Sequence, residues 1–197
     1  MLEIATLHGP ARVKVDAAAE PRGALVLGHG AGGGIGARDL VAAARAANNV
    51  GLSAVLVEQP YRVAGRRSPA PATQLDAAWL AVLAYLRAHE LEGLPVVTGG
   101  RSSGARVACR TSEETGAAGV LCLAFPLIPP SGTSRLPELE AVRVPVLIVQ
   151  GITDRFGMPP TGRNRRVLQV TGDHSLRRGL DSAAADVEKW LRRVTAD

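Results

Sequence analysis

The chain has 197 residues and a mass of 20.5 kDa, the size of a single domain with one hydrophobic core. Hydrophobic residues make up 46% and charged residues 21%, a composition that excludes a disordered chain or a coiled coil. The net charge is +5 at pH 7, but the arginines are scattered and aromatic residues make up only 3%, so we expect no nucleic-acid partner.

Two cysteines, Cys109 and Cys122, lie in apolar stretches and are too few for a disulfide framework. Residues 1–10 lack a basic segment followed by an apolar run, which a secretory signal requires. The longest apolar stretch, residues 117–128, is too short to span a bilayer, so we expect no membrane partner. We therefore predict a cytoplasmic protein with a single domain over residues 1–197.

Strand and helix patterns alternate along the chain. Residues 3–7 and 11–15 flank Gly9-Pro10 and predict a two-stranded antiparallel edge. Continuous apolar runs predict six further strands, at 24–28, 53–59, 95–100, 119–126, 144–151 and 166–172. Helical patterns occupy the segments 37–50 (capped by Gly51), 73–90, the stretch after Ser102, and 175–194. This alternation predicts an open α/β fold with a mostly parallel sheet and helices on both faces.

The final helix is predicted to lie against the sheet. Its apolar residues recur at helical spacing: Leu176, Leu180, Val187, Trp190, Leu191 and Val194.

A glycine-rich turn joins one predicted strand to the next helix in the stretch VVTGGRSSGARVA, residues 96–108. A serine held at such a sharp turn takes a strained backbone conformation, and the residues two before and two after it come too close for side chains. Gly100 and Gly104 occupy those positions around Ser102. We therefore predict that Ser102, and not Ser103, is a nucleophile.

A nucleophilic serine needs a base, and the base needs a carboxylate that orients it. Asp154 and His174 each follow a predicted parallel strand, so both are expected at the same sheet edge as Ser102. Asp173, adjacent to the base, is expected to shape the turn instead. The remaining histidines are expected in an edge hairpin, a glycine loop and a helix end: His8, His29 and His89.

Acyl transfer also needs an oxyanion hole made of backbone N–H groups. One N–H comes from the residue after the nucleophile, here Ser103, and the other from the loop after an early strand. The segment LGHGAGGG at 27–34 fits that loop, with Ala31 as the first candidate donor and Gly32 as the next. His29 is expected to brace the loop.

The same loop supports an alternative function. Residues Gly28 to Gly33 match the dinucleotide fingerprint GxGxxG, and Glu58 ends the next predicted strand. A dinucleotide-binding oxidoreductase would leave the serine, acid and base in that chain order unexplained. A strand pair also precedes the fingerprint, whereas a dinucleotide fold begins with the fingerprint strand, so the hydrolase interpretation is favoured.

Six segments, taken in order, resemble the α/β-hydrolase superfamily over nearly the whole chain: 28–33, 58–71, 99–108, 125–132, 150–157 and 172–174. Within it, the chain resembles a small group that lacks a lid, is related to dienelactone hydrolases and includes a subunit of the eukaryotic non-specific-lethal chromatin complex. The resemblance implies an α/β-hydrolase fold with no lid domain. It matches Ser102, Asp154 and His174 to the superfamily's nucleophile, acid and base.

These features predict a serine hydrolase, of carboxylesterase or thioesterase type, that forms an acyl-enzyme without a cofactor or metal. Dienelactone hydrolases use cysteine as the nucleophile, so the serine here argues against a dienelactone substrate. Only residues 126–143 separate the strand after the elbow helix from the strand that bears the acid, and their prolines predict a loop with at most one short helix. The expected site is shallow and suits small acyl groups.

Three arginines are candidates for substrate contacts: Arg62, Arg66 and Arg101. Together with Arg67 they could select an ester that carries a carboxylate or a phosphate, although a solvated basic loop explains them as well. A second class of function also stays open, namely a non-catalytic interaction module that keeps the fold without turnover. The sequence leaves the oligomeric state undetermined.

Overall fold

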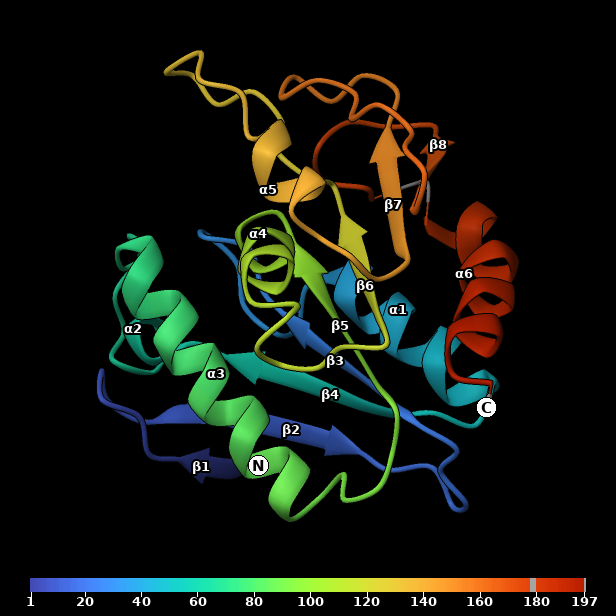
Figure 1. Ribbon diagram of the computed structural model, residues 1–197. Coiled ribbons are helices and arrows are strands. Elements are labelled where there is room, and N and C mark those ends of the chain that lie inside the picture. The colour runs from blue at the N-terminus through green and yellow to red at the C-terminus, as the bar shows by residue number, and fades with distance from the viewer. Residues whose placement is uncertain (178–179, 197) are drawn as a thin grey trace.

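A computed structural model describes residues 1–177 and 180–196, which form a sheet of eight strands flanked by helices (Figure 1). The strands lie in the order β1-β2-β4-β3-β5-β6-β7-β8. β1 (Leu2–Ile4) pairs antiparallel with β2 (Ala11–Asp16), and β2 pairs antiparallel with β4 (Ser53–Glu58). The parallel part consists of β4 with β3 (Ala24–Gly28), β5 (Val96–Arg101), β6 (Gly119–Leu123), β7 (Val146–Gly151) and β8 (Arg165–Val170). The predicted sheet and its antiparallel N-terminal edge are confirmed.

Helices cover both faces of the sheet. α1 (Arg38–Asn49) and α6 (Leu180–Val194) contact each other on one face. The other face carries α3 (Ala72–Ala88), α4 (Ser103–Arg110) and the short α5 (Leu136–Glu140). Figure 1 shows α3 and α4 in front of the sheet and α1 behind it. The sequence pattern did not predict α2 (Pro60–Val63), a single turn after β4.

One tryptophan packs against the sheet on each of its faces. Trp79 on α3 lies over Gly28 of β3, and Trp190 on α6 lies over Gly119 of β6. Both rings are buried, and a side chain at either glycine would crowd the ring above it. In a chain with so few aromatic residues, replacing either tryptophan by alanine would cost about 3–5 kcal/mol of stability.

The final helix is shorter than predicted. Residues 175–177 were expected to be helical, but Leu176 has a φ of 50° and its N–H bonds to the carbonyl of Asp173, so these residues form a turn. Residues 178–179 lie outside the described part, and α6 begins at Leu180. Leu176 still enters the core from the turn.

The segment where hydrolases can carry a lid is short, as predicted. Between β6 and β7 the chain forms loops and the five residues of α5. Arg106 and Arg110 on α4 pair with Glu138 on α5, so this segment is held against the helix that follows the predicted elbow. In the described part of the chain, no helix combines the length and the hydropathy needed to cross a membrane.

Candidate active site

Ser102 lies at the turn between β5 and α4, where the predicted elbow is found. Its φ of 51° and ψ of −105° place a non-glycine residue in a strained backbone region. The turn is held because the Ser102 N–H donates to the carbonyl of Leu123 over 2.9 Å, and its own carbonyl accepts from Arg106 over 3.2 Å. The strain therefore presents the serine side chain at the carboxyl edge of the sheet.

Glycine is required at both elbow positions because one backbone oxygen lies close to each of them. A Cβ at Gly100 or at Gly104 would collide with the carbonyl oxygen of Gly28, the last residue of β3. Gly28 lies beside Gly100 in the parallel pairing of β3 with β5. The backbones of β3, β5 and α4 thus meet at a point that leaves no room for side chains, which confirms the reason for glycine at both positions.

The three side chains of the predicted triad meet at this edge. His174 Nε2 lies 3.0 Å from Ser102 Oγ, and His174 Nδ1 lies 2.8 Å from Asp154 Oδ2. In this arrangement the serine hydroxyl donates to Nε2 and Nδ1–H donates to the carboxylate. The side chain of Asp154 is 0% exposed and that of His174 is 18% exposed, so the carboxylate is shielded while the imidazole reaches solvent.

Two residues that the sequence analysis did not single out hold the acid and the base. The N–H of Phe156 donates to Asp154 Oδ1 over 2.9 Å, and Gln150 Nε2 donates to Asp154 Oδ2 over 2.8 Å. The Phe156 ring packs edge-on against the imidazole of His174, with 4.5 Å between ring centroids. One signal for Gln150 was present in the sequence: an amide at the end of an otherwise apolar strand.

Asp173 shapes the turn, as predicted. Its Oδ1 atom accepts hydrogen bonds from both the N–H and the hydroxyl of Ser175. These bonds lower the pKa of the exposed Asp173 carboxyl. The carboxylate that contacts the imidazole belongs to Asp154.

In the loop after β3, the N–H groups of Ala31 and Gly32 point away from the hydrogen bonds that the loop carbonyls accept. The Gly30 carbonyl accepts from the Gly33 N–H over 3.0 Å and the His29 ring over 2.9 Å. Because C=O and the following N–H point in opposite directions across a trans peptide, the N–H of Ala31 faces the other way. The Ala31 carbonyl accepts from the Tyr61 hydroxyl over 2.9 Å, which likewise turns the Gly32 N–H away.

Two further features support the oxyanion-hole geometry. Ser103 is the first residue of α4, where N–H groups have no acceptor inside the helix. Burial raises the pKa of Tyr61 to about 12, so the hydroxyl that holds Ala31 stays protonated. Ala31, Gly32 and Ser103 therefore remain the candidate donors.

His29 braces the glycine loop, as predicted. Its Nε2 accepts from the Gln59 N–H over 3.1 Å, so its Nδ1–H donates to Gly30. Burial lowers the pKa of His29, which keeps the ring neutral with both nitrogens bonded. Since the loop continues to Ala37 and α1 begins only at Arg38, the glycines do not open a helix as the dinucleotide fingerprint requires. This geometry favours the hydrolase interpretation over the dinucleotide one.

Arg101 has protein partners rather than a free guanidinium group. Its Nε lies 2.8 Å from Asp39 Oδ2, and its Nη2 donates to the His174 carbonyl over 3.2 Å. Burial, as the largest influence, raises the pKa of Asp39, and the Arg101 charge acts in the opposite direction. Arg101 thus braces α1 and the base, and its contact with a substrate stays a prediction.

Arg62 and Arg66 belong to the segment around α2. Arg62 Nη1 donates to the Arg66 carbonyl over 3.1 Å. The exposed Arg66 lines a hollow with Tyr61 and Gln74 beside α2. A contact of either arginine with a substrate stays a prediction.

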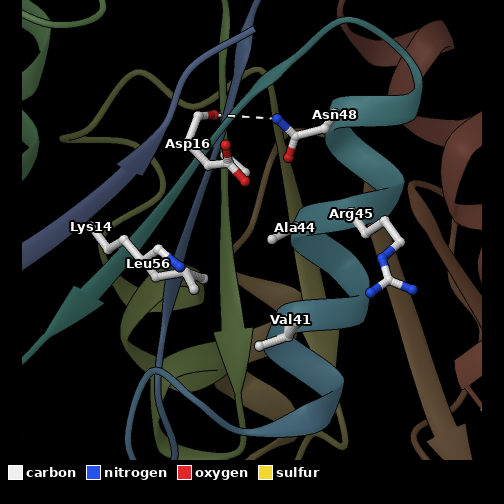
Figure 2. Close-up of a pocket in the computed structure, with 8 residues that line it drawn as sticks. Lys14, Asp16, Val41, Ala44, Arg45, Asn48 and Leu56 are labelled. Carbon is white, nitrogen blue, oxygen red and sulfur yellow. Dashed lines mark hydrogen bonds between the residues drawn. The ribbon is translucent and has the colours of Figure 1, made fainter.

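A separate groove lies between α1 and the strands β2 and β4. Figure 2 shows Val41 and Ala44 of α1 facing Lys14 and Leu56 of the strands across this groove, with Asn48 bonded to the Asp16 carbonyl at one end. Its volume is about 330 Å³. The groove is lined by residues of α1, β2 and β4, so it is distinct from the site around Ser102.

Comparisons with known proteins agree on the fold. A family described as "Alpha/beta hydrolase domain" matches residues 21–195. A serine hydrolase without a lid from Xanthomonas campestris is similar, with a TM-score of 0.81 and 20% identity over 98% of this chain and 93% of its own. Est1E from Butyrivibrio proteoclasticus, solved with ferulic acid bound, has a TM-score of 0.80 and 15% identity over 100% of both chains.

A dienelactone hydrolase from Anabaena variabilis is also similar, with a TM-score of 0.78 and 14% identity over 98% of this chain and 95% of its own. No curated protein matches the chain. At these identities, the structural likenesses show the fold alone.

Proposed function

Because the chain belongs to the α/β-hydrolase family, we propose that it is a serine hydrolase that cleaves a small ester or thioester through an acyl-enzyme. The observation that carries the proposal is the hydrogen-bonded series at the sheet edge. Ser102 Oγ lies 3.0 Å from His174 Nε2, and His174 Nδ1 lies 2.8 Å from Asp154 Oδ2. This series has the geometry that a hydroxyl nucleophile needs at neutral pH.

In the first step, Ser102 Oγ attacks the acyl carbon while its proton passes to His174 Nε2. The carbonyl oxygen becomes an oxyanion that accepts hydrogen bonds from the N–H of Ser103 and the N–H of Ala31 or Gly32. Asp154 holds the imidazole in the tautomer with Nδ1–H and stabilises the imidazolium that forms. When the carbonyl re-forms, the bond to the leaving oxygen or sulfur breaks, and His174 returns the proton to that atom.

Water completes the reaction. His174 Nε2 takes a proton from a water molecule while the water oxygen attacks the acyl carbon. The bond from Ser102 Oγ to the acyl carbon then breaks. The proton returns to Ser102 and the acid product leaves. The reaction consumes one water for each ester or thioester, and the same backbone donors serve both steps.

The open surroundings of Ser102 favour small or solvent-exposed acyl groups. The segment between β6 and β7 holds only the five-residue helix α5, so little apolar surface is available to enclose a long chain. Because Est1E was solved with ferulic acid, esters of aromatic acids belong in a first substrate screen.

Covalent labelling by a fluorophosphonate tests the proposal. Attack of Ser102 Oγ on phosphorus would expel fluoride, release the hydroxyl proton, and add the mass of the probe less HF to the intact protein. We expect labelling of the wild type and none for Ser102→Ala or His174→Ala. A circular dichroism spectrum of each variant would establish that the loss of labelling does not reflect unfolding.

A folded wild type that is not labelled would contradict the proposal and favour the non-catalytic interaction module. Labelling that persists in Ser102→Ala would place the reactive serine elsewhere. If labelling behaves as expected, matched ester and thioester substrates of the same acyl group would then identify the leaving-group preference.

We further propose that the protein works in the cytoplasm. Cys109 and Cys122 form no disulfide, although their sulfur atoms lie 3.6 Å apart, and the hydrogen bond with Cys109 together with burial raises the pKa of the Cys122 thiol. Two buried thiols that form no disulfide suit a reducing compartment. Protein purified without a reductant and then unfolded should react with an alkylating reagent at both cysteines. A disulfide between them would contradict this proposal.

A further inference from the structure

Gln150 is buried directly beside the acid of the proposed site. It is the last residue but one of β7, and its side chain is 0% exposed. Its Nε2 lies 2.8 Å from Asp154 Oδ2, 3.0 Å from the Gly157 carbonyl oxygen and 3.1 Å from the Phe125 carbonyl oxygen. The amide nitrogen carries two hydrogens and faces three acceptors beyond the ends of β6 and β7, so one hydrogen is shared between two of them.

The orientation of this amide is dictated by its surroundings. If the amide were rotated by half a turn, Gln150 Oε1 would face the three acceptor oxygens and repel them. In the orientation found, Oε1 is buried and has no hydrogen-bond partner among residues 1–177 and 180–196. Burying a carbonyl oxygen without a donor costs free energy. The hydrogen bonds that Nε2 makes must offset this cost, so they determine the orientation of the amide.

The bond from Gln150 falls on the same carboxylate oxygen that faces the base. Asp154 Oδ2 accepts from Gln150 Nε2 and from His174 Nδ1, while Oδ1 accepts from the Phe156 N–H. We propose that Gln150 is a positioning residue that fixes the rotation of the Asp154 carboxylate and thereby the direction of His174. This inference rests on the proposed function.

Gln150 also joins the two loops beside the base. Its bonds to Phe125 and Gly157 connect the chain after β6 with the chain after β7. The same two loops are linked again where the Ile128 N–H donates to the Phe156 carbonyl over 2.8 Å. The Phe156 ring packs against the His174 imidazole. Gln150 therefore supports the base both through Asp154 and through the loop that carries Phe156.

Replacement of Gln150 by methionine tests the proposal, because methionine keeps the length of the side chain and removes the donor. The matched control is Asn164→Leu. Asn164 Nδ2 also donates to two backbone carbonyls, those of Val142 and Val144, each over 2.8 Å, but at the opposite end of β7. Both variants lose amide hydrogen bonds to backbone carbonyls, and only Gln150→Met also loses a bond to Asp154.

We expect Gln150→Met to lower kcat on an ester found in the substrate screen by about 100-fold while KM changes less than about twofold, because a misdirected base slows chemistry more than binding. Asn164→Leu should retain kcat within about twofold. If Gln150→Met does not fold, Gln150→Asn, whose amide is one methylene too short to reach Asp154, takes its place. An unchanged kcat in a folded Gln150 variant would overturn the proposal.

A second readout does not depend on turnover. In protein with ¹⁵N-labelled histidine, the proton on His174 Nδ1 reports its bond to Asp154 by its chemical shift. We expect this resonance to move or to be lost through exchange in Gln150→Met and to stay in place in Asn164→Leu. A resonance that is the same in all three proteins would overturn the positioning role even if the wild type showed no hydrolase activity. Absent activity with a displaced resonance would instead contradict the proposed function alone.

Discussion

Arg101 and Asp39 form an ion pair in which Nε and Oδ2 lie 2.8 Å apart, and this pair joins the residue before the proposed nucleophile to the first turn of α1. The same guanidinium group donates to the His174 carbonyl. Three segments far apart in the sequence are thereby held together behind Ser102. The positive charge next to the nucleophile therefore contributes to the framework of the site.

Arg101→Leu is expected to destabilise the protein by about 3–5 kcal/mol, because it leaves the carboxylate of Asp39 buried without its partner. The side chain of Asp39 is only 2% exposed. Urea unfolding of this variant, of Asp39→Leu and of the double variant measures the effect. The double variant should be more stable than Arg101→Leu alone, and simple addition of the two single costs would show that the pair is not coupled.

Gly104→Ala is expected to impair both folding and labelling by fluorophosphonate, because its Cβ would collide with the Gly28 carbonyl oxygen. Gly36→Ala is the matched control, since a Cβ at Gly36 meets no atom within 4 Å. The control should change the free energy of unfolding by less than about 0.5 kcal/mol. Equal effects of the two substitutions in thermal denaturation would refute the steric account of the elbow.

The two neighbouring candidates for the acid should differ strongly in their effect on turnover. Asp154→Asn is expected to lower kcat by about 10⁴-fold, because the amide would favour the wrong tautomer of His174. Asp173→Asn should stay within a few-fold of the wild type, since Asp173 bonds to Ser175 in an exposed turn. Steady-state kinetics on one ester decide between them, and the opposite ranking would reverse the assignment.

Stability should fall in mild acid because of His29. Burial lowers the pKa of His29 below its usual 6.5, so the unfolded chain binds the proton more readily than the folded protein does. The stabilisation by the neutral ring is complete above the unfolded pKa and is lost as the pH falls toward the lowered value. His29→Gln does not titrate, so the stability gap between wild type and variant should narrow from pH 7.5 to pH 5 in urea unfolding. A constant gap would contradict this view of His29.

The sequence was informative where one physical constraint dominates a segment. Strands covered on both faces must be apolar throughout, and the runs that became β3, β6 and β7 are buried along their whole length. The elbow was readable because crowding at Gly100 and Gly104 admits only glycine. Ser102, Asp154 and His174 could be placed at one sheet edge because each follows a parallel strand.

Features that depend on long-range contacts could not be predicted. Whether Arg101 faces a substrate or a carboxylate depends on Asp39, which is 62 positions away in the chain and reaches it only through the packing of α1. The turn at residues 175–177 depends on the backbone of Leu176, where the apolar spacing alone favours a helix. The contacts of Gln150 need the relative placement of two loops, which no local pattern specifies.

The exposed turn at residues 130–134 gives the protein a place where new chain can be added. It projects between β6 and α5, while the pairs from α4 to Glu138 anchor the segment that follows it. Exposed loop tips of this kind accept insertions because few contacts are disturbed. A helical hairpin grafted there would add chain between β6 and α5 while leaving Ser102, Asp154 and His174 unchanged.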